Sequence, residues 1–307
     1  MVHVQSHFGI GRTLIAGARR KGIPVLATNH FMPENLIGYA PLPRRIADAV
    51  CRLAWRDCVR VFRRAALVTA PTPRAVQLLR DQGLDGDVLP VSCGLDLRRF
   101  GQPSVTGPDD RLRVLFVGRL DAEKNVDVLL RALPLLPAGL PVVAEIVGDG
   151  SCRRDLEELA RTLGVADRVV FHGLASDQEV IDAYARCDVF CMPGTAELQS
   201  LATMEAMAAG MPVVAADAMA LPHLVHPGRN GLLFPPGDAP ALAAALATVL
   251  GSATGRAHMG EASREIIARH DIEATLDAFE SLYCEATKEN ESGRSGGRSA
   301  YPAHSGR

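Results

Sequence analysis

The sequence predicts an α/β fold made of two domains, each built around a parallel sheet. Short apolar runs alternate with longer stretches of helical periodicity along most of the chain, a pattern typical of βαβ units. A run such as Leu112–Val117 is predominantly apolar, as strands covered on both faces are. The length of 307 residues corresponds to about two domains at roughly 150 residues each.

The predicted strands and helices follow from these runs and from the helical periodicity. Strands are expected at Val2–Gln5, Pro24–Thr28, Ala66–Ala70, Leu112–Val117, Val142–Val147, Arg168–Phe171, Asp188–Met192 and Pro212–Ala215. Helices are expected at Glu123–Leu136, Cys152–Leu163, Asp177–Arg186, Ser200–Ala209 and Ile272–Ala286.

A turn-rich stretch without apolar periodicity, Gly101–Pro108, separates the two halves and is predicted to be a linker. We place a first domain at residues 1–107, a second at 108–268 and a C-terminal helix at 269–288. Residues 289–307 are rich in Ser, Gly and Arg and are expected to form a disordered tail. The first domain opens directly on a strand and holds few strands, so we expect that it lacks its start.

The composition excludes several classes of protein. Thirty-three Lys and Arg against 35 Asp and Glu give a net charge of -2, and aromatic residues are scarce, so no nucleic-acid partner is expected. No apolar run approaches the roughly 18 residues that span a bilayer, and the N-terminus shows no signal peptide. The seven cysteines include no Cys-x-x-Cys pair, which favours reduced thiols and a cytoplasmic location.

The first candidate site begins where a predicted strand ends, at Gly118. Arg119 follows, and Lys124 falls in the first turn of the next predicted helix. A cation at that place opposes the positive end of the helix dipole, so its presence is explained if a phosphate binds there. The alternative is a solvated Lys124 paired with Glu123 or Asp121, and the spacing alone leaves both interpretations open.

A second loop at the end of a predicted strand contains Gly148 and Gly150, where the absence of side chains lets a ligand approach the backbone. A dinucleotide fingerprint would need a third glycine where Arg153 stands. A nicotinamide enzyme is therefore not predicted.

The most informative pair is Glu197 and Glu205, which are separated by seven residues. Glu197 lies in a predicted loop, whereas Glu205 lies in a predicted helix of mostly apolar or small residues. A buried carboxylate is costly without hydrogen-bond donors, which either ligand hydroxyls or an internal Arg or Lys would supply. Backbone amides at the start of this helix would also face an anion. They belong to Leu198, Gln199, Ser200 and Leu201.

Two features of the first half also bear on function. His30 follows a predicted parallel strand at the end where ligands bind in such folds, although a lone histidine is more often structural. The stretch Arg44–Arg64 carries seven arginines and fits either an anionic membrane surface or a solvated helix face. Its apolar residues are Ile46, Val50, Leu53, Trp55 and Phe62. The sequence shows no convincing set of metal ligands.

In their order and spacing, these segments resemble the family-four retaining glycosyltransferases, whose GT-B fold has two Rossmann-like domains facing a cleft. The resemblance covers most of the chain from Val2 to about Ala286. The motifs that carry it are Gly118-Arg119-Leu120, Glu123-Lys124-Asn125, Val147-Gly148-Asp149-Gly150, Phe171-His172-Gly173, the Glu197 and Glu205 pair, and Asn230-Gly231-Leu232-Leu233-Phe234.

The resemblance implies a hexosyltransferase that takes a UDP- or GDP-linked sugar as donor and needs no cofactor. Arg119 and Lys124 would bind the diphosphate and stabilise its charge without a metal ion. Glu205 would bind the ribose, while Glu197 and His30 would act at the transferred sugar. The remaining implied donor contacts are Gly118, Gly148, Phe171, Leu174, Leu198, Gln199, Ser200 and Leu201, with the base near 171–174.

One departure from the family pattern bears on the acceptor. After Glu197 the family continues with Ser-Phe-Gly, where this chain has Leu198-Gln199-Ser200, a variant closer to branches that glycosylate diacylglycerol. With the basic stretch Arg44–Arg64, this favours a lipid acceptor and a peripheral position at the inner face of the membrane. Two other hypotheses stay open, namely a sugar-nucleotide 2-epimerase of the same fold and a nucleotide-sugar-binding remnant without turnover.

Overall fold

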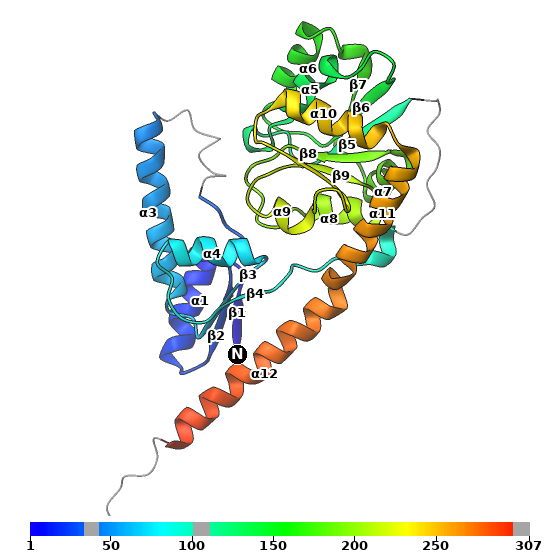
Figure 1. Cartoon of the computed structure of the whole chain (residues 1–307). Coiled ribbons are helices and arrows are strands. Elements are labelled where there is room, and N and C mark those ends of the chain that lie inside the picture. The colour runs from blue at the N-terminus through cyan, green and yellow to red at the C-terminus, as the bar shows by residue number, and fades with distance from the viewer. Residues whose placement is uncertain (34–42, 101–110, 297–307) are drawn as a thin grey trace, which may run out of the picture. The chain divides into compact units, whose positions relative to one another are not determined.

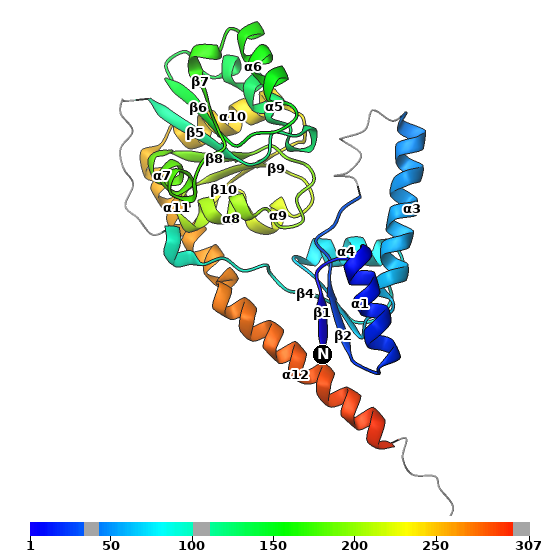
Figure 2. The same ribbon diagram turned by 180° about the vertical axis from the view of Figure 1, so that it is seen from behind.

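Two parallel sheets organise the chain, one in each of the two units drawn in Figures 1 and 2. This computed structural model describes residues 1–33, 43–100 and 111–296. Unit 1 joins Met1–Pro33 and Pro43–Ser92 to the chain from Ala274 onward, whereas unit 2 runs from Cys93 to Glu273. The predicted α/β class with two parallel sheets is confirmed.

Unit 1 contains a four-stranded sheet in the order β1-β2-β3-β4. Its neighbouring strands are parallel, so helices carry the chain back from the end of one strand to the start of the next. The apolar faces of these helices supply the core, where Ile15, Phe62 and Leu79 are at most 1% exposed. The elements are β1 (Val2–Val4), α1 (Gly9–Arg20), β2 (Val25–Thr28), α3 (Arg44–Phe62), β3 (Leu67–Ala70), α4 (Pro73–Asp81) and β4 (Val88–Pro90).

The last helix, α12 (Ile272–Gly296), completes unit 1 from Ala274 onward. The Tyr283 hydroxyl lies 2.7 Å from Nδ1 of His3 in β1, and the Phe279 ring packs 5.2 Å from the same imidazole. The first strand and the last helix of the described chain therefore pack together in one unit.

Unit 2 contains a six-stranded parallel sheet in the order β10-β9-β8-β5-β6-β7. Every residue of β6, β8 and β9 is buried, which explains why these strands are mostly apolar. The strands are β5 (Leu112–Val117), β6 (Val142–Val147), β7 (Val169–Gly173), β8 (Val189–Met192), β9 (Val213–Ala216) and β10 (Gly231–Phe234).

Helices cover both faces of this sheet (Figure 1). Helices α5, α6 and α10 contact one another on one face, and α8 packs against α11 on the other. Helix α7 begins with a capping box, in which the Ser176 hydroxyl and the Glu179 carboxylate each bind the other residue's amide. The helices are α5 (Val126–Ala132), α6 (Arg153–Thr162), α7 (Asp177–Arg186), α8 (Leu201–Ala208), α9 (Leu221–Leu224), α10 (Ala239–Leu250) and α11 (Ala253–Ile267), with 3-10 turns η1 (Leu97–Phe100), η2 (Ala122–Lys124), η3 (Leu133–Leu135), η4 (Ala166–Arg168) and η5 (Ala268–His270).

The predicted strands are confirmed to within one or two residues, and the predicted α7 matches the structure. Strands β4 and β10 were not predicted, because each is short and is preceded by turn residues. The helix expected at Glu123–Leu136 is instead divided into η2, α5 and η3. Asn125 causes the first break by adopting a left-handed conformation with φ of 48°.

The domain limits also differ from those expected. Unit 2 begins at Cys93 rather than at 108, since the Leu95 amide donates to the His270 carbonyl and Phe100 is buried in the unit 2 core. The helix expected as a separate segment at 269–288 packs into unit 1 and continues to Gly296, so a disordered tail from 289 is wrong for 289–296. The predicted linker Gly101–Pro108 and residues 297–307 lie outside the described residues.

Candidate functional site

The candidate site lies where the loops after β5 and β8 meet. These strands are neighbours in the sheet, and the order of strands reverses between them, because β6 and β7 continue on one side and β9 and β10 on the other. Ligands of open α/β sheets bind at the carboxyl ends of the strands at such a point. The two loops are tied together, since the Thr195 amide donates to the Glu123 carbonyl over 3.1 Å and the Asn125 amide group to the Thr195 hydroxyl over 3.1 Å.

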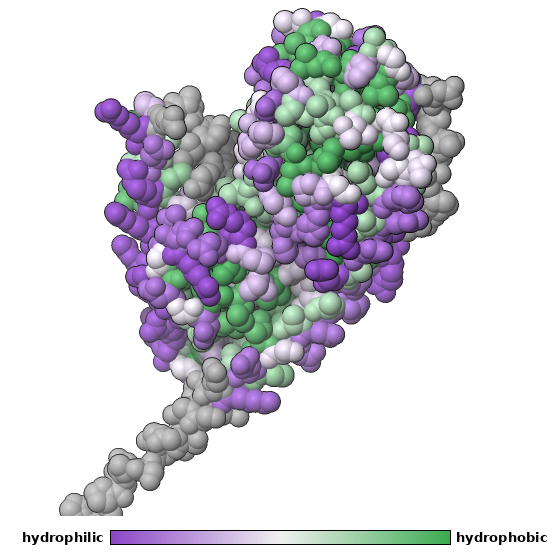
Figure 3. Space-filling view, viewed as in Figure 1, coloured by the Kyte–Doolittle hydropathy of each residue, from purple (hydrophilic) through white to green (hydrophobic). Residues whose placement is uncertain are grey.

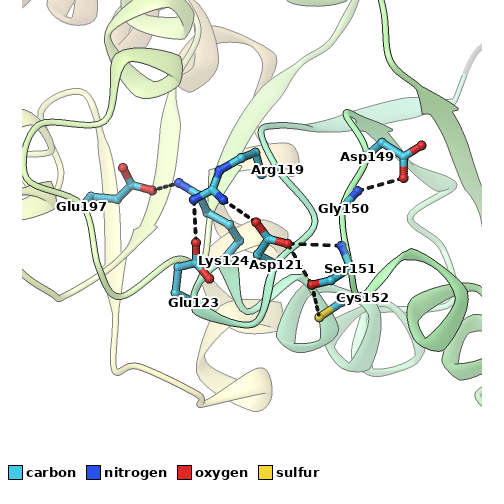
Figure 4. Close-up of polar contacts among 9 residues, drawn as sticks. All are labelled: Arg119, Asp121, Glu123, Lys124, Asp149, Gly150, Ser151, Cys152 and Glu197. Carbon is cyan, nitrogen blue, oxygen red and sulfur yellow. Dashed lines mark hydrogen bonds and ion pairs between the residues drawn. The ribbon is translucent and has the colours of Figure 1, made fainter. Parts of the chain in front are cut away.

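An ion pair between Lys124 and Glu197 links the two loops (Figure 4). Lys124 Nζ donates to Glu197 Oε1 over 2.5 Å, and the two side chains are 17% and 10% exposed. The alternative prediction paired a solvated Lys124 with Glu123 or Asp121, and this predicted partner is wrong. The structure brings together two residues that lie 73 positions apart.

The Arg119 side chain is half exposed and lies beside the same loop. Its guanidinium donates to Asp121 over 2.5 Å and to Glu123 over 2.8 Å, as Figure 4 shows. Asp121 is held in turn by the amide and the hydroxyl of Ser151. Glu123 Oε2 is buried and has no hydrogen-bond partner within the described parts of the chain, so a ligand donor would satisfy it. Arg119 is thus positioned by carboxylates while much of its surface stays accessible.

The glycines Gly118 and Gly148 pack against each other at the ends of β5 and β6. Gly148 has φ of 129°, and a Cβ atom there would lie 1.9 Å from the Gly118 carbonyl oxygen. The Gly148 amide also donates to the Gly173 carbonyl over 2.8 Å. The absence of a side chain at Gly148 is therefore required by the strand ends themselves, whether or not a ligand approaches.

Glu205 lies on α8 and is partly buried, as expected. Its Oε2 accepts from the Tyr184 hydroxyl over 2.9 Å, whereas no Arg or Lys within the described residues hydrogen-bonds to it. Burial raises the pKa of Glu205, and the Tyr184 hydrogen bond opposes this rise. An internal Arg or Lys was one expected partner of Glu205, but the structure shows a tyrosine instead.

The start of α8 carries the predicted amides of residues 198–201. Ser200 is the residue before the helix and has φ of 64°, and its hydroxyl bonds the Thr203 hydroxyl over 2.8 Å instead of capping an amide. The Gln199 side chain accepts from the Cys93 amide over 2.8 Å, while Leu201 is 49% exposed. The first turn of α8 therefore lacks a side-chain cap from Ser200, which suits the binding of an anion.

A cavity of about 220 Å³ opens at the carboxyl ends of β6 and β7. Leu174, expected near the base, belongs to it and is 85% exposed. Phe171 was expected there too, but its ring packs against the unit 2 core and does not line this cavity. The lining residues are Val147, His172, Leu174, Ala175, Glu179, Asp182 and Arg186.

Sequence analysis missed a buried ionic cluster behind this cavity. Glu145 in β6 is 2% exposed and accepts hydrogen bonds from Arg113, Arg186 and His172 at 2.5 to 3.0 Å. A lone charge inside each of two otherwise apolar strands, Arg113 in β5 and Glu145 in β6, was the available signal. The cluster fixes β7 and α7, the two elements that carry most of the cavity wall.

His30 lies in unit 1, directly after β2. Its Nε2 donates to Gln5 Oε1 over 2.6 Å, and burial lowers the pKa of His30, which favours a neutral imidazole. His30 therefore contacts Gln5, the residue that follows β1. The role of His30 at a transferred sugar stays a prediction.

Helix α3 presents both charged and apolar side chains to solvent. Purple, hydrophilic side chains run along its length in Figure 3. The exposed arginines include Arg52, Arg56, Arg60 and Arg63, and the exposed apolar residues are Ile46, Val50 and Leu53. Trp55 and Phe62 were expected to add to this surface but are buried in the core. No helix within residues 1–33, 43–100 and 111–296 is long and apolar enough to cross a membrane.

Two family models match the chain. Residues 101–266 match the model described as glycosyl transferases group 1, and residues 1–99 match that of glycosyltransferase family 4. A D-inositol 3-phosphate glycosyltransferase of Xylanimonas cellulosilytica is 31% identical over 304 residues, which cover 93% of this chain and 72% of that protein. An alpha-monoglucosyldiacylglycerol synthase of Streptococcus pneumoniae is 26% identical over 76% of this chain and 55% of that protein.

Solved structures share the fold. A sucrose-phosphate synthase from Thermosynechococcus elongatus has a TM-score of 0.81 and 25% identity, over 94% of this chain and 74% of that chain. The Anabaena protein HepE, in complex with UDP-glucose, has a TM-score of 0.74 and 24% identity, over 88% of this chain and 75% of that chain.

Proposed function

The chain belongs to the family-four glycosyltransferases of the GT-B fold, which use sugar-nucleotide donors, and we propose that it transfers a hexose with retention of configuration and without a metal ion. The observation that carries this proposal is the largely buried Lys124–Glu197 pair at the reversal point of the sheet, beside the accessible Arg119. Two cations, Lys124 and Arg119, and the Glu197 carboxylate lie together there, which supports the binding of a diphosphate and the sugar attached to it.

We infer that binding of the diphosphate exchanges the partner of Lys124. A phosphate oxygen replaces Glu197 Oε1 at the ammonium group, and the carboxylate released from this pair turns to the transferred sugar. As the sugar–phosphate bond breaks through an oxocarbenium-like state, negative charge grows on the leaving diphosphate. Lys124, Arg119 and the uncapped start of α8 stabilise that charge, because they are positioned before the reaction.

The rest of the donor is assigned to neighbouring features. The ribose lies at Glu205, whose carboxylate accepts hydrogen bonds from its hydroxyls, and the base lies in the cavity beside Leu174. The relatives reported above are glycosyltransferases, which favours transfer over epimerisation.

We further propose a lipid hydroxyl as acceptor and a peripheral membrane position. The likeness to a diacylglycerol-glycosylating enzyme and the exposed arginines and apolar side chains of α3 support this. An amphipathic basic surface of this kind binds anionic bilayers through charge and buried apolar area together. His30 is proposed to act at the transferred sugar from unit 1, and the cytoplasmic location stays a prediction.

The experiment that tests the proposal is a thermal-shift titration with UDP and GDP. A nucleotide at about a hundredfold over its Kd adds about 2.7 kcal/mol to the stability of the protein, or about 5 to 10 °C for a unit of this size. Lys124→Ala should abolish this shift, whereas the matched control Lys21→Ala in unit 1 should keep it. Comparing each variant with and without nucleotide removes the direct effect of the substitution on stability.

An unchanged shift in Lys124→Ala would contradict the phosphate role of this lysine. Product analysis with a nucleotide sugar and a diacylglycerol acceptor then separates the remaining functions. Free nucleoside diphosphate plus a glycoside indicates transfer, an isomerised sugar nucleotide indicates epimerisation, and binding without turnover indicates the remnant.

A further inference from the structure

We propose that Tyr184 is a positioning residue for Glu205, holding one carboxylate oxygen so that the other is presented to a ribose hydroxyl. The inference rests on the proposed function, which assigns the ribose of the donor to Glu205. Tyr184 lies on α7 and Glu205 on α8, and neither the spacing of the residues nor a motif connects them.

The Tyr184 ring has one well-defined orientation. It is 2% exposed, packs edge-on against Phe100 of η1 with 5.9 Å between ring centroids, and lies tilted against Phe190 of β8 at 6.0 Å. Because the aromatic neighbours come from two other elements, the hydroxyl at the end of the ring is fixed relative to the sheet. A rigid donor is what a carboxylate needs if its orientation is to be set in advance.

The Tyr184 hydroxyl lies near two possible acceptors on α8. It lies 2.9 Å from Glu205 Oε2 and 3.1 Å from the carbonyl oxygen of Ala202, one turn earlier in α8. A phenol has one proton, and an ionised carboxylate is the stronger acceptor of the two. Tyr184 therefore donates to Oε2 and holds the glutamate side chain against α8.

The second oxygen of the carboxylate, Oε1, is left for a ligand. Within residues 1–33, 43–100 and 111–296, no group is hydrogen-bonded to Oε1, and this atom is not among the buried polar atoms that lack a partner. Oε1 is therefore not completely buried in the free protein. A hydroxyl donor from a ribose would complete the coordination of the carboxylate.

Among the groups around Glu205, Tyr184 has the most specific effect on the pKa of the carboxylate. Burial raises the pKa of Glu205, the Tyr184 hydrogen bond lowers it, and Arg99 of η1 and Asp177 of α7 act in opposite directions. Arg99 and Asp177 are paired with each other at 2.8 Å. Helix α11, which also packs on α8, contributes Arg264, whose guanidinium donates to the Ala209 carbonyl at the far end of the helix. Burial raises the pKa of Tyr184 well above 10, so its hydroxyl stays protonated and acts as a donor.

The test compares ribose recognition in Tyr184→Phe with that in Tyr283→Phe. Both substitutions remove one hydroxyl that is hydrogen-bonded, but Tyr283 lies in unit 1. Dissociation constants are measured by calorimetry for UDP and GDP and for their 2′-deoxy and 3′-deoxy analogues. The native protein should bind the better nucleotide about tenfold more tightly than at least one deoxy analogue, as expected for one hydrogen bond to a charged group.

In Tyr184→Phe this preference should fall to about threefold or less, because Oε1 is no longer held in place. Loss of the hydrogen bond also raises the pKa of Glu205, so the pH at which affinity is half-maximal should move upward. Tyr283→Phe should keep both the preference and the pH midpoint. In a Glu205→Ala background, adding Tyr184→Phe should change neither the preference for the parent nucleotide nor the pH dependence of its affinity, since the two residues act through one carboxylate.

A second measurement does not depend on the folding of Tyr184→Phe. In protein labelled with 3-fluorotyrosine, one fluorine resonance should follow the titration of Glu205 and shift when nucleotide binds, and it should lose both responses in Glu205→Ala. A Tyr184→Phe variant that keeps the preference and the pH midpoint would overturn the inference. So would an equal loss of affinity for the parent and deoxy nucleotides, and so would a fluorine spectrum insensitive to Glu205→Ala. Failure of the native protein to bind UDP or GDP would instead refute the proposed function.

Discussion

Substitution of Glu145 by glutamine tests whether the buried ionic cluster of unit 2 supports its fold. Glutamine keeps the shape of the side chain but removes its charge. Its amide NH2 group would face the same groups that now donate hydrogen bonds to the carboxylate. Arg113 and Arg186, whose side chains are 7% and 25% exposed, would then both lose the negative charge of Glu145.

The size of the effect follows from this burial. Removing one partner of a buried ion pair costs about 3 to 5 kcal/mol, because the remaining charge stays desolvated. Glu145 is 2% exposed and its carboxylate receives three charged or polar donors, so the loss should lie within this range. For a unit of about this size, the melting temperature should fall by about 10 °C.

The assay is urea denaturation followed by circular dichroism, with Glu158→Gln as the matched control. Glu158 also pairs with an arginine, Arg161, but both side chains are more than 60% exposed. The control should lose less than about 1 kcal/mol, as is usual for surface pairs. If Glu145→Gln lost no more than Glu158→Gln, the cluster would not stabilise unit 2 as argued.

The pH dependence gives a second check on the same residue. Burial alone would raise the pKa of Glu145, but the hydrogen bonds from Arg186 and Arg113 outweigh it and hold the pKa below its ordinary value of 4.5. A lowered carboxyl pKa contributes stability that is fully present above 4.5 and is lost as the pH falls through the folded value. The difference between the native protein and Glu145→Gln should be constant from about pH 7 to 5 and should shrink in more acidic solution.

Three further changes test the site and the proposed membrane surface. Gly148→Ala should destabilise unit 2 by about 3 kcal/mol or more in urea denaturation, because its Cβ would lie 1.9 Å from a carbonyl oxygen. The control Gly139→Ala, which has open space around its Cβ position, should change the stability by no more than about 0.5 kcal/mol. Equal losses of stability in the two variants would contradict the close packing at Gly148. Glu197→Gln should lower turnover in the product assay about a hundredfold and change the nucleotide Kd less than about threefold, and near-normal turnover would remove its role. In liposome flotation, the native protein should be recovered with anionic but not neutral vesicles and Arg52→Glu/Arg56→Glu should lose this preference, whereas equal recovery with both lipids would reject electrostatic docking.

The parts of the site that the sequence predicted are those that lie in continuous motifs. Arg119, Lys124 and Glu197 lie in the segments that follow predicted strands, so the predicted strand ends placed them near the edge of a sheet, and the family resemblance supplied their roles. The pairing of Lys124 with Glu197 was not predicted, since it depends on β5 and β8 being neighbours, and strand order is not encoded in spacing. The Tyr184 partner of Glu205 was missed for the same reason, because it comes from a different helix.

Local structure was predicted well where side-chain patterns were long and uniform, and less well where one residue decides the conformation. The left-handed conformation of Asn125 interrupts a stretch with continuous helical periodicity, and the apolar periodicity does not predict this interruption. Near the C-terminus, the Ser-, Gly- and Arg-rich residues from Glu289 onward suggested a disordered tail, yet α12 continues to Gly296. Polar composition therefore did not by itself mark the end of this helix.

The membership of α12 in unit 1 sets an order for folding during synthesis. All the strands of unit 2 lie between Cys93 and Glu273, so they have all left the ribosome once Glu273 emerges. Unit 1 begins earlier in the chain, but it is complete only after α12 has been synthesised and Tyr283 can contact His3. Unit 2 is thus the first unit that can be completed, and a nascent chain stalled before α12 would carry a completed unit 2 and an incomplete unit 1.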